Sequence, residues 1–146
     1  MENQYRIIET AAEFEELVTE LEPEPVIAVD LEADSMHHFK EKVCLLQLAT
    51  SKTSAIIDPL ALHDLSALKP VFANPKIKKV FHGADYDVRS LYRDFEIDVH
   101  HLFYTQLASM FMGIKETGLD AVLQSRFAVK LDKKFQRKDW SVRPLP

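Results

Sequence analysis

The strongest structural signal in the sequence is an apolar run that ends in two acidic residues. Residues 26–32 read Val-Ile-Ala-Val-Asp-Leu-Glu. A short run rich in β-branched residues favours a buried strand, although its length alone leaves a buried helix segment open. Because side chains alternate along a strand, Asp30 and Glu32 would point to the same side. Two carboxylates on one face repel each other, so the pair indicates either a solvent-facing strand end or a site for a divalent cation.

The composition is typical of one soluble domain. The chain has 146 residues, of which 47% are hydrophobic and 28% are charged, and this length predicts a single domain over residues 1–146. Its one cysteine, Cys44, lies in an apolar run and cannot form an internal disulfide, so we expect a buried thiol. No apolar run approaches the roughly 18 residues of a membrane span, and the acidic N-terminus does not resemble a signal peptide. We therefore expect a cytoplasmic protein with no membrane partner, and the sequence leaves its oligomeric state open.

The charges are distributed unevenly along the chain. The net charge is −5, but residues 1–34 hold eleven acidic residues and one basic residue. Residues 126–143 hold seven basic residues and two acidic ones. The global charge argues against a strongly basic binding protein. The basic segment indicates either an edge that binds phosphates or a solvated tail.

Apolar periodicity outlines an α/β protein. Thr10 and Glu13 have the spacing of a capping box at the start of a helix. Short spacings between the second, third and fourth expected strands suit hairpin connections, and helices alternate with strands after them. This order favours a mixed sheet flanked by helices. We expect strands near residues 5–8, 26–32, 43–49, 54–57 and 77–81, and helices near residues 10–21, 64–73, 84–95, 105–112 and 118–127.

A third acidic residue lies near the buried stripe of the helix that follows the fifth expected strand. Asp87 is four residues before an apolar position of that stripe, whereas Asp85 is four residues before Arg89 and suits a solvent-facing ion pair. An acid that points toward a sheet needs a partner. The helix N-terminus or a metal shared with Asp30 and Glu32 would supply one. The alternative is an ordinary acidic residue in the first turn of a helix.

Three segments of the chain, in this order, match motifs of a known family. Asp30-Leu-Glu32 matches an Asp-x-Glu motif, and His82-Gly-Ala-Asp-Tyr-Asp87-Val-Arg-Ser-Leu91 matches His-x-x-x-x-Asp-x-x-x-Leu. Residues 136–145 are similar to a stretch typical of ribonuclease D. From about residue 5 to its end, the chain thus resembles the ribonuclease D branch of the DEDD 3′–5′ exonucleases. The resemblance implies a ribonuclease H-like fold, with a mixed β-sheet flanked by helices.

The resemblance also implies a metal-dependent active site. Asp30, Glu32 and Asp87 would be the catalytic residues and the metal ligands, with Asp30 bridging two ions. Hard carboxylate ligands suit Mg²⁺ or Mn²⁺. Two such ions provide a nucleophile and stabilise the leaving oxygen of a phosphodiester.

Six further residues are candidates for contacts with nucleic acid. Gln47 would touch the substrate or satisfy polar groups at a strand end, and His82 would serve the site or shape a turn. Trp140, the only tryptophan, would stack on a base or pack against the core. The basic residues of the C-terminal segment would bind phosphates. The full set is Gln47, His82, Arg137, Lys138, Trp140 and Arg143.

The chain departs from the family pattern at two places. Tyr104 stands before Thr105, where the family usually has an aspartate that caps a helix, and the loss of such a cap costs about 1 kcal/mol. The family's third motif, Tyr-x-x-x-Asp, should follow shortly after Leu145, but the chain stops at Pro146. We therefore expect an exonuclease domain that is incomplete at its C-terminus, in which two-metal hydrolysis is impaired.

The leading functional hypothesis is a 3′–5′ exoribonuclease domain that trims single-stranded 3′ ends of RNA. By resemblance, its substrates would be structured RNAs or tRNAs. One alternative is a DNA 3′–5′ exonuclease, because no residue here visibly reads the ribose 2′-hydroxyl. The other is a catalytically incomplete module that binds nucleic acid without turnover.

Overall fold

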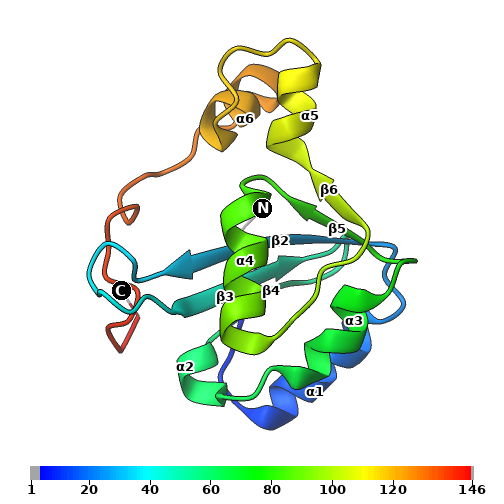
Figure 1. Ribbon diagram of the computed structural model, residues 1–146, viewed down its shortest axis with the longest axis vertical. Helices are drawn as coiled ribbons and strands as arrows, with labels where there is room; N and C mark the ends of the chain where they lie inside the picture. Colours follow the sequence, from blue (N-terminus) through cyan, green and yellow to red (C-terminus); the bar gives the residue numbers. More distant parts are fainter. Residues whose placement is uncertain (1–3, 146) are drawn as a thin grey trace.

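The computed structural model describes residues 4–145 and contains a six-stranded mixed sheet (Figure 1). The strand order is β1-β4-β3-β2-β5-β6. The strands are β1 (Arg6–Ile8), β2 (Val26–Ala33), β3 (Val43–Ala49), β4 (Ser54–Ile57), β5 (Lys78–Phe81) and β6 (Leu102–Tyr104). Strand β2, which carries the two acids of the first motif, is antiparallel to β3 and parallel to β5. The predicted hairpins and the mixed α/β sheet are confirmed.

The helices are α1 (Ala11–Leu21), α2 (Pro59–Leu62), η1 (Ser66–Leu68, a 3₁₀ turn), α3 (Lys69–Ala73), α4 (Ala84–Phe95), α5 (Thr105–Phe111) and α6 (Leu119–Phe127). The predicted capping box of α1 is present, because the Glu13 N–H donates to Thr10 Oγ1 (3.3 Å) and the Thr10 N–H donates to Glu13 Oε2 (3.1 Å). In Figure 1, α4 crosses in front of the sheet, whereas α5 and α6 stand away from it at the top.

One hydrophobic core joins the sheet to α1, η1, α3 and α4. Along β2, Ile27, Val29 and Leu31 point into this core, and Ala28 and Asp30 point to the opposite face. Burial of an aliphatic side chain stabilises a fold by roughly 1.5–3 kcal/mol, so this alternation fixes the register of β2. Cys44 is buried, as predicted.

The structure differs from the sequence prediction at three places. The helix expected over residues 64–73 is divided into η1 and α3, because Pro70 lies in the first turn of α3 and has no N–H to continue a helix from its N-terminal side. Helix α2 and strand β6 were not predicted. Asp58 caps α2 by accepting from the Leu60 N–H (2.9 Å), and β6 is a three-residue strand defined by its parallel pairing with β5.

The C-terminal part of the chain is loosely attached to the sheet. Helix α6 has no buried residue, and the segment that follows it contains no regular secondary structure up to residue 145. This segment runs back toward the β2–β3 loop, where His37 Nε2 lies 3.2 Å from the Arg137 carbonyl oxygen and His38 Nε2 lies 3.1 Å from Ser141 Oγ (Figure 1). Tyr104 provides no side-chain cap to α5, as predicted. Over residues 4–145, every helix is too short or too polar to cross a membrane.

Candidate active site

Asp30 and Glu32 lie at the end of β2, at a central position of the sheet. Asp30 pairs across the strands with Gln47 of β3, which places this glutamine beside the first acid. The pairing register shifts between Glu32 and Ala33, so β2 is irregular directly after the second acid. Asp30 is exposed and Glu32 is half-buried. The strand therefore presents both carboxylates near its end, as the alternation of side chains predicted.

Asp87 lies in the first turn of α4 and is only 7% exposed. Its pKa is raised to about 7, first by the loss of hydration on burial and then by the negative charges of Asp30 and Glu32. Burial and the charge of Asp30 raise the pKa of Glu32 to about 7 as well, and a partial loss of hydration around its carboxylate raises the pKa of the otherwise exposed Asp30. Asp30 thus opposes the ionisation of Glu32, and both oppose the ionisation of Asp87, so the three acids are electrostatic neighbours.

Asp87 differs from every other buried acid in the described part of the chain. Residues 4–145 contain four buried acidic side chains, and three of them form ion pairs with a basic side chain. The pairs are Glu24 with Lys52 (2.5 Å), Asp34 with Lys42 (2.5 Å) and Asp58 with Arg143 (2.7 Å). Asp87 has no such partner there and faces two further acids instead. A buried carboxylate in this position needs a cation to be stable when ionised.

The donor set suits a divalent cation, but its geometry is incomplete. Carboxylate oxygens are the ligands that Mg²⁺ and Mn²⁺ prefer. Nevertheless, no three Asp, Glu, His or Cys side chains among residues 4–145 are close enough together to hold a metal ion. The roles of Asp30, Glu32 and Asp87 as metal ligands therefore stay predictions: the charges of Asp30 and Glu32 raise the pKa of Asp87, but the three side chains do not form a ready ligand set.

A cleft of about 570 Å³ lies beside the first two acids. Asp30, Glu32 and Gln47 line one side of it, and residues of α6 and of the C-terminal segment line the other. Trp140 borders this cleft and contacts Phe135 edge to face, with 6.5 Å between the ring centroids. The buried Trp140 Nε1–H has no hydrogen-bond partner among the described residues. Both roles considered for Trp140 remain compatible with this position, because it packs on an aromatic ring and borders the cleft.

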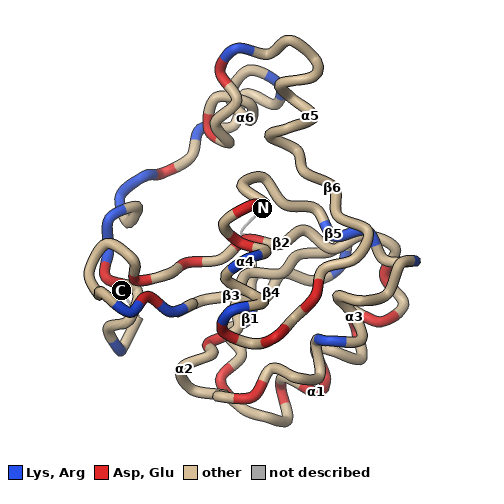
Figure 2. Tube along the Cα trace, in the orientation of Figure 1, with Lys and Arg blue, Asp and Glu red and all other residues tan. Residues whose placement is uncertain are grey.

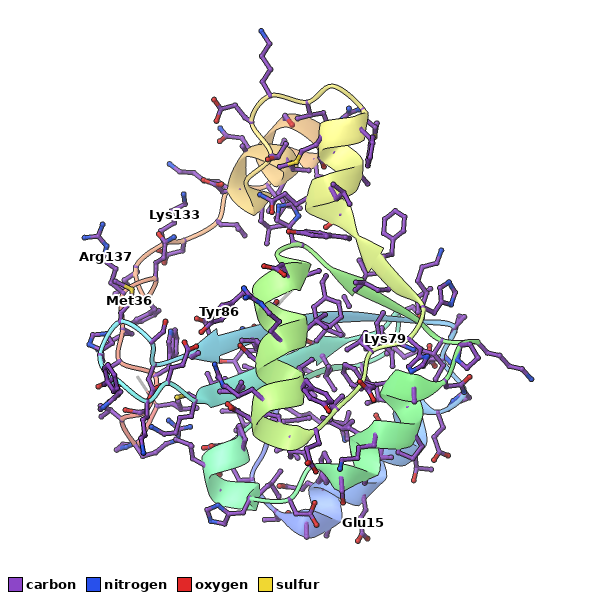
Figure 3. All side chains as sticks on the ribbon, in the orientation of Figure 1. Glu15, Met36, Lys79, Tyr86, Lys133 and Arg137 are labelled. Carbon is purple, nitrogen blue, oxygen red and sulfur yellow. The ribbon has the colours of Figure 1, made fainter. Side chains whose placement is uncertain are left out.

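Lys and Arg residues are frequent along the segment between α6 and the C-terminus (Figure 2). Arg137 and Lys138 are exposed there, and Figure 3 shows Arg137 pointing outward beside Met36 of the β2–β3 loop. Lys133 already pairs with Asp120 of α6. The phosphate contacts expected of Arg137 and Lys138 stay predictions: both side chains are accessible, and accessibility alone does not show what they bind.

Arg143 has a structural role that its charge alone did not indicate. Its guanidinium forms two hydrogen bonds with Asp58, at 2.7 and 2.8 Å, and a third with the Cys44 carbonyl oxygen at 3.1 Å. Asp58 is 1% exposed, and the guanidinium lowers the pKa of this carboxyl. The pair fastens the C-terminal segment to the end of β4. A phosphate contact by Arg143 would have to compete with this bidentate ion pair.

His82 follows β5 on the same sheet face as Asp30, and both line a hollow of about 660 Å³. Its Nδ1 lies 2.9 Å from Thr105 Oγ1, and its Nε2 lies 2.8 Å from the Thr117 carbonyl oxygen. The sequence did not predict the roles of these two threonines, because the contacts join residues that are distant in sequence.

The sequence analysis also did not single out Phe135. Phe135 has Lys134 and Lys138 near its ring, and an aromatic residue among basic ones is typical of nucleic-acid binding.

Comparison with known proteins supports the motif assignment. A family model described as a 3′–5′ exonuclease matches residues 5–146. The chain belongs to the 3′–5′ exonuclease family. It is 38% identical over 139 residues to the exosome complex exonuclease RRP6 of Saccharomyces cerevisiae, and the match covers 94% of this chain and 19% of the yeast protein.

Two solved structures of the family share the fold. The catalytic core of RRP6 from Trypanosoma brucei has a TM-score of 0.93 at 37% identity, over 98% of this chain and 40% of that one. Escherichia coli RNase D, an exoribonuclease involved in structured RNA processing, has a TM-score of 0.90 at 30% identity, over 98% and 38% of the two chains. The ribonuclease H-like exonuclease fold is thereby confirmed. The chain spans less than half of these structures and about a fifth of the yeast protein.

Proposed function

We propose that this chain is the nuclease domain of a 3′–5′ exoribonuclease that shortens RNA from its 3′ end. The observation that carries the proposal is Asp87, a buried acid that faces Asp30 and Glu32 and lacks the basic partner that the other buried acids have. This arrangement is costly for folding and is typical of a site where cations and phosphates meet. Family membership and the kinship with RNase D support a nuclease over other metal-dependent enzymes.

The three acids have distinct tasks in the proposed reaction. Asp30, at the strand end beside Gln47, faces the open cleft and would touch the terminal phosphodiester region through bound cations. Glu32 and Asp87 would be the further carboxylate ligands of these cations. Mg²⁺ or Mn²⁺ bound there would stabilise negative charge on the attacked phosphate and acidify the attacking water. Because no three ligands are in place in the described part of the chain, we infer that the cations bind weakly.

The RNA would enter along the basic segment. Arg137 and Lys138 offer charge for backbone phosphates, and Trp140 with Phe135 offers aromatic surface beside the cleft for unpaired bases. Stacking and phosphate contacts tolerate any base sequence, which suits an enzyme that removes successive nucleotides. The proposed substrate class is the single-stranded 3′ end of a structured RNA.

A gel assay with a 5′-labelled single-stranded RNA tests the proposal. In Mg²⁺ or Mn²⁺ we expect a ladder of shortened products, and none with Asp30→Asn, with EDTA or with a 3′-phosphate-blocked RNA. The matched DNA oligonucleotide distinguishes a ribonuclease from a DNA exonuclease. A chain extended by the segment that follows the matched region in E. coli RNase D should be more active. A ladder that persists in Asp30→Asn would contradict the proposal.

The second candidate is a nucleic-acid-binding module without turnover. The incomplete metal geometry favours it, because a two-metal reaction loses orders of magnitude when one cooperating group is missing. The same assay decides between the two. RNA binding by this chain with no shortening, together with activity of the extended chain, would identify a binding module derived from an enzyme.

A further inference from the structure

The position of α5 and α6 depends on very few contacts. Helix α6 buries no residue, and in α5 only Ser109 is buried. Within residues 4–145, every side-chain hydrogen bond that joins residues 105–129 to residues 4–103 involves His82 or Thr105. Figure 1 shows the two helices standing away from the sheet, connected to it through β6. This pair of helices is therefore held to the sheet by a small set of hydrogen bonds around His82 and Thr105, and α6 is held to the C-terminal segment by the ion pair of Asp120 with Lys133.

His82 is the centre of that set. Thr117 offers a carbonyl oxygen, which only accepts, so His82 Nε2 must carry the proton of the 2.8 Å hydrogen bond. His82 Nδ1 lies 2.9 Å from Thr105 Oγ1, which in turn lies 3.0 Å from the Phe81 carbonyl oxygen. The single Thr105 hydroxyl proton goes either to His82 Nδ1 of the neutral ring or to the Phe81 carbonyl oxygen, whereas the charged ring donates from Nδ1 to Thr105 Oγ1 and leaves that proton for Phe81. The bond to Thr117 is kept in both states.

The residues directly after Thr117 form part of the substrate cleft. Gly118, Leu119 and Asp120 line the cleft of about 570 Å³ opposite Asp30. Leu119 also borders the adjoining hollow of about 660 Å³ that contains both His82 and Asp30. Movement of Thr117 would thus displace one wall of the space beside the first catalytic acid.

We propose that His82 is a positioning residue that tethers the start of α6 through Thr117 and so sets the width of the cleft beside Asp30. His82 itself contacts no substrate in this scheme. It holds two segments that are 35 residues apart in sequence, and the wall they form guides the RNA end. The tethering of Thr117 by His82 is argued from the structure alone, whereas the effect on RNA binding rests on the proposed function.

Three substitutions separate the two ring nitrogens. His82→Gln places an amide N–H near the position of Nε2 and keeps a donor for Thr117. His82→Asn reaches only as far as Nδ1, and His82→Ala removes both contacts. His100→Ala is the matched control, because His100 is exposed and its side chain makes no hydrogen bond in the described part of the chain. Urea unfolding of each variant verifies that the fold is retained, and the Gln–Asn comparison remains informative if the Ala variant does not fold.

The first readout is amide hydrogen exchange in α5 and α6, with α4 as the internal reference. Loss of one hydrogen bond should speed exchange by roughly two- to tenfold in the Asn and Ala variants, while the Gln variant and the control stay near the wild type. The second readout is the Kd for a fluorescent single-stranded RNA in EDTA, which should rise by roughly two- to tenfold in the same two variants. Agreement of the two readouts supports the proposal.

Other outcomes overturn it. Unchanged exchange in all variants would show that His82 does not hold α6, and a Gln variant as perturbed as Ala would exclude the bond to Thr117 as the tether. Faster exchange with an unchanged Kd would show that this wall does not shape RNA binding. A wild-type chain that binds no RNA would overturn the proposed function and the guiding role together, and the exchange data would still decide the tether.

Discussion

Replacement of Asp87 by asparagine should stabilise this protein at neutral and alkaline pH. Asp87 is 7% exposed, and its pKa is raised to about 7 by burial and by Asp30 and Glu32. At pH 8 the folded chain must therefore carry a buried negative charge next to two others. Asparagine has nearly the same shape and carries no charge, so the substitution removes the repulsion and leaves the packing of α4 in place.

The magnitude follows from the pKa. A rise from 3.8 to about 7 corresponds to about 4 kcal/mol at ~1.4 kcal/mol per unit. Because Asp30 is exposed and Glu32 is half-buried, solvent and salt screen part of this repulsion, and we expect about 2 kcal/mol in practice. Between about pH 4 and pH 7 the unfolded chain has lost a proton that the folded chain still holds. Stability should thus fall as pH rises through this window and level off above pH 7.

Urea unfolding at half-unit steps from pH 5 to pH 8 measures this effect as the difference between the wild type and Asp87→Asn. Part of the difference should already be present at pH 5, because the window opens near pH 4, and we expect it to grow to about 2 kcal/mol in favour of the variant at pH 8. Mn²⁺ at ten times its Kd should restore about 1.4 kcal/mol to the wild type at pH 8 and less to the variant. A variant that is equally or less stable than the wild type at pH 8 would refute the reasoning.

Three further outcomes follow from the charged residues. Arg143→Met should destabilise the fold by about 2–3 kcal/mol in urea, because it leaves Asp58 buried and unpaired, and Asp58→Asn should add little to it in the double variant. Replacement of Arg137 and Lys138 by glutamine should reduce the slope of log Kd for single-stranded RNA against log salt by about 0.7 per lost phosphate contact, whereas an unchanged slope would identify an idle segment. At constant ionic strength, Mg²⁺ should tighten RNA binding by the wild type but not by Asp30→Asn, and equal tightening in both would show that the cation acts elsewhere.

The part of the fold that could be predicted from the sequence rests on local signals. The Thr10–Glu13 capping box, the alternation of Ile27 and Val29 along β2, and the helical stripe of α4 are each specified by residues a few positions apart. Such patterns persist in the structure because the buried face of each element is already decided by its own sequence. The position of Asp87 on the buried side of α4 belongs to this class.

The parts that could not be predicted depend on contacts between distant residues. Strand β6 has only three residues and exists because it pairs with β5. Lys79 is fully buried, and its Nζ donates to the carbonyl oxygens of Asn74 (2.8 Å) and Ile77 (2.6 Å). No pattern in the sequence predicts this burial or these contacts. Arg143 was expected at phosphates on the strength of its charge, but its partner Asp58 lies 85 residues away. The motifs likewise predicted which acids are neighbours, and not whether three of them ligate together.

The distribution of paired and unpaired charges bears on how an acidic chain would bind RNA under the proposed function. With a net charge of −5 and an acidic site, the protein repels a phosphate chain unless positive charge is supplied close to that site. The C-terminal segment brings Arg137 and Lys138 to the side of the cleft, since Trp140 borders the cleft and Arg143 fastens the segment to Asp58. The remaining deficit lies at the carboxylates themselves, where no basic side chain of the described residues pairs with Asp87. Under the proposed function bound cations would supply it, so cation binding and RNA binding would favour each other and each would be weak alone.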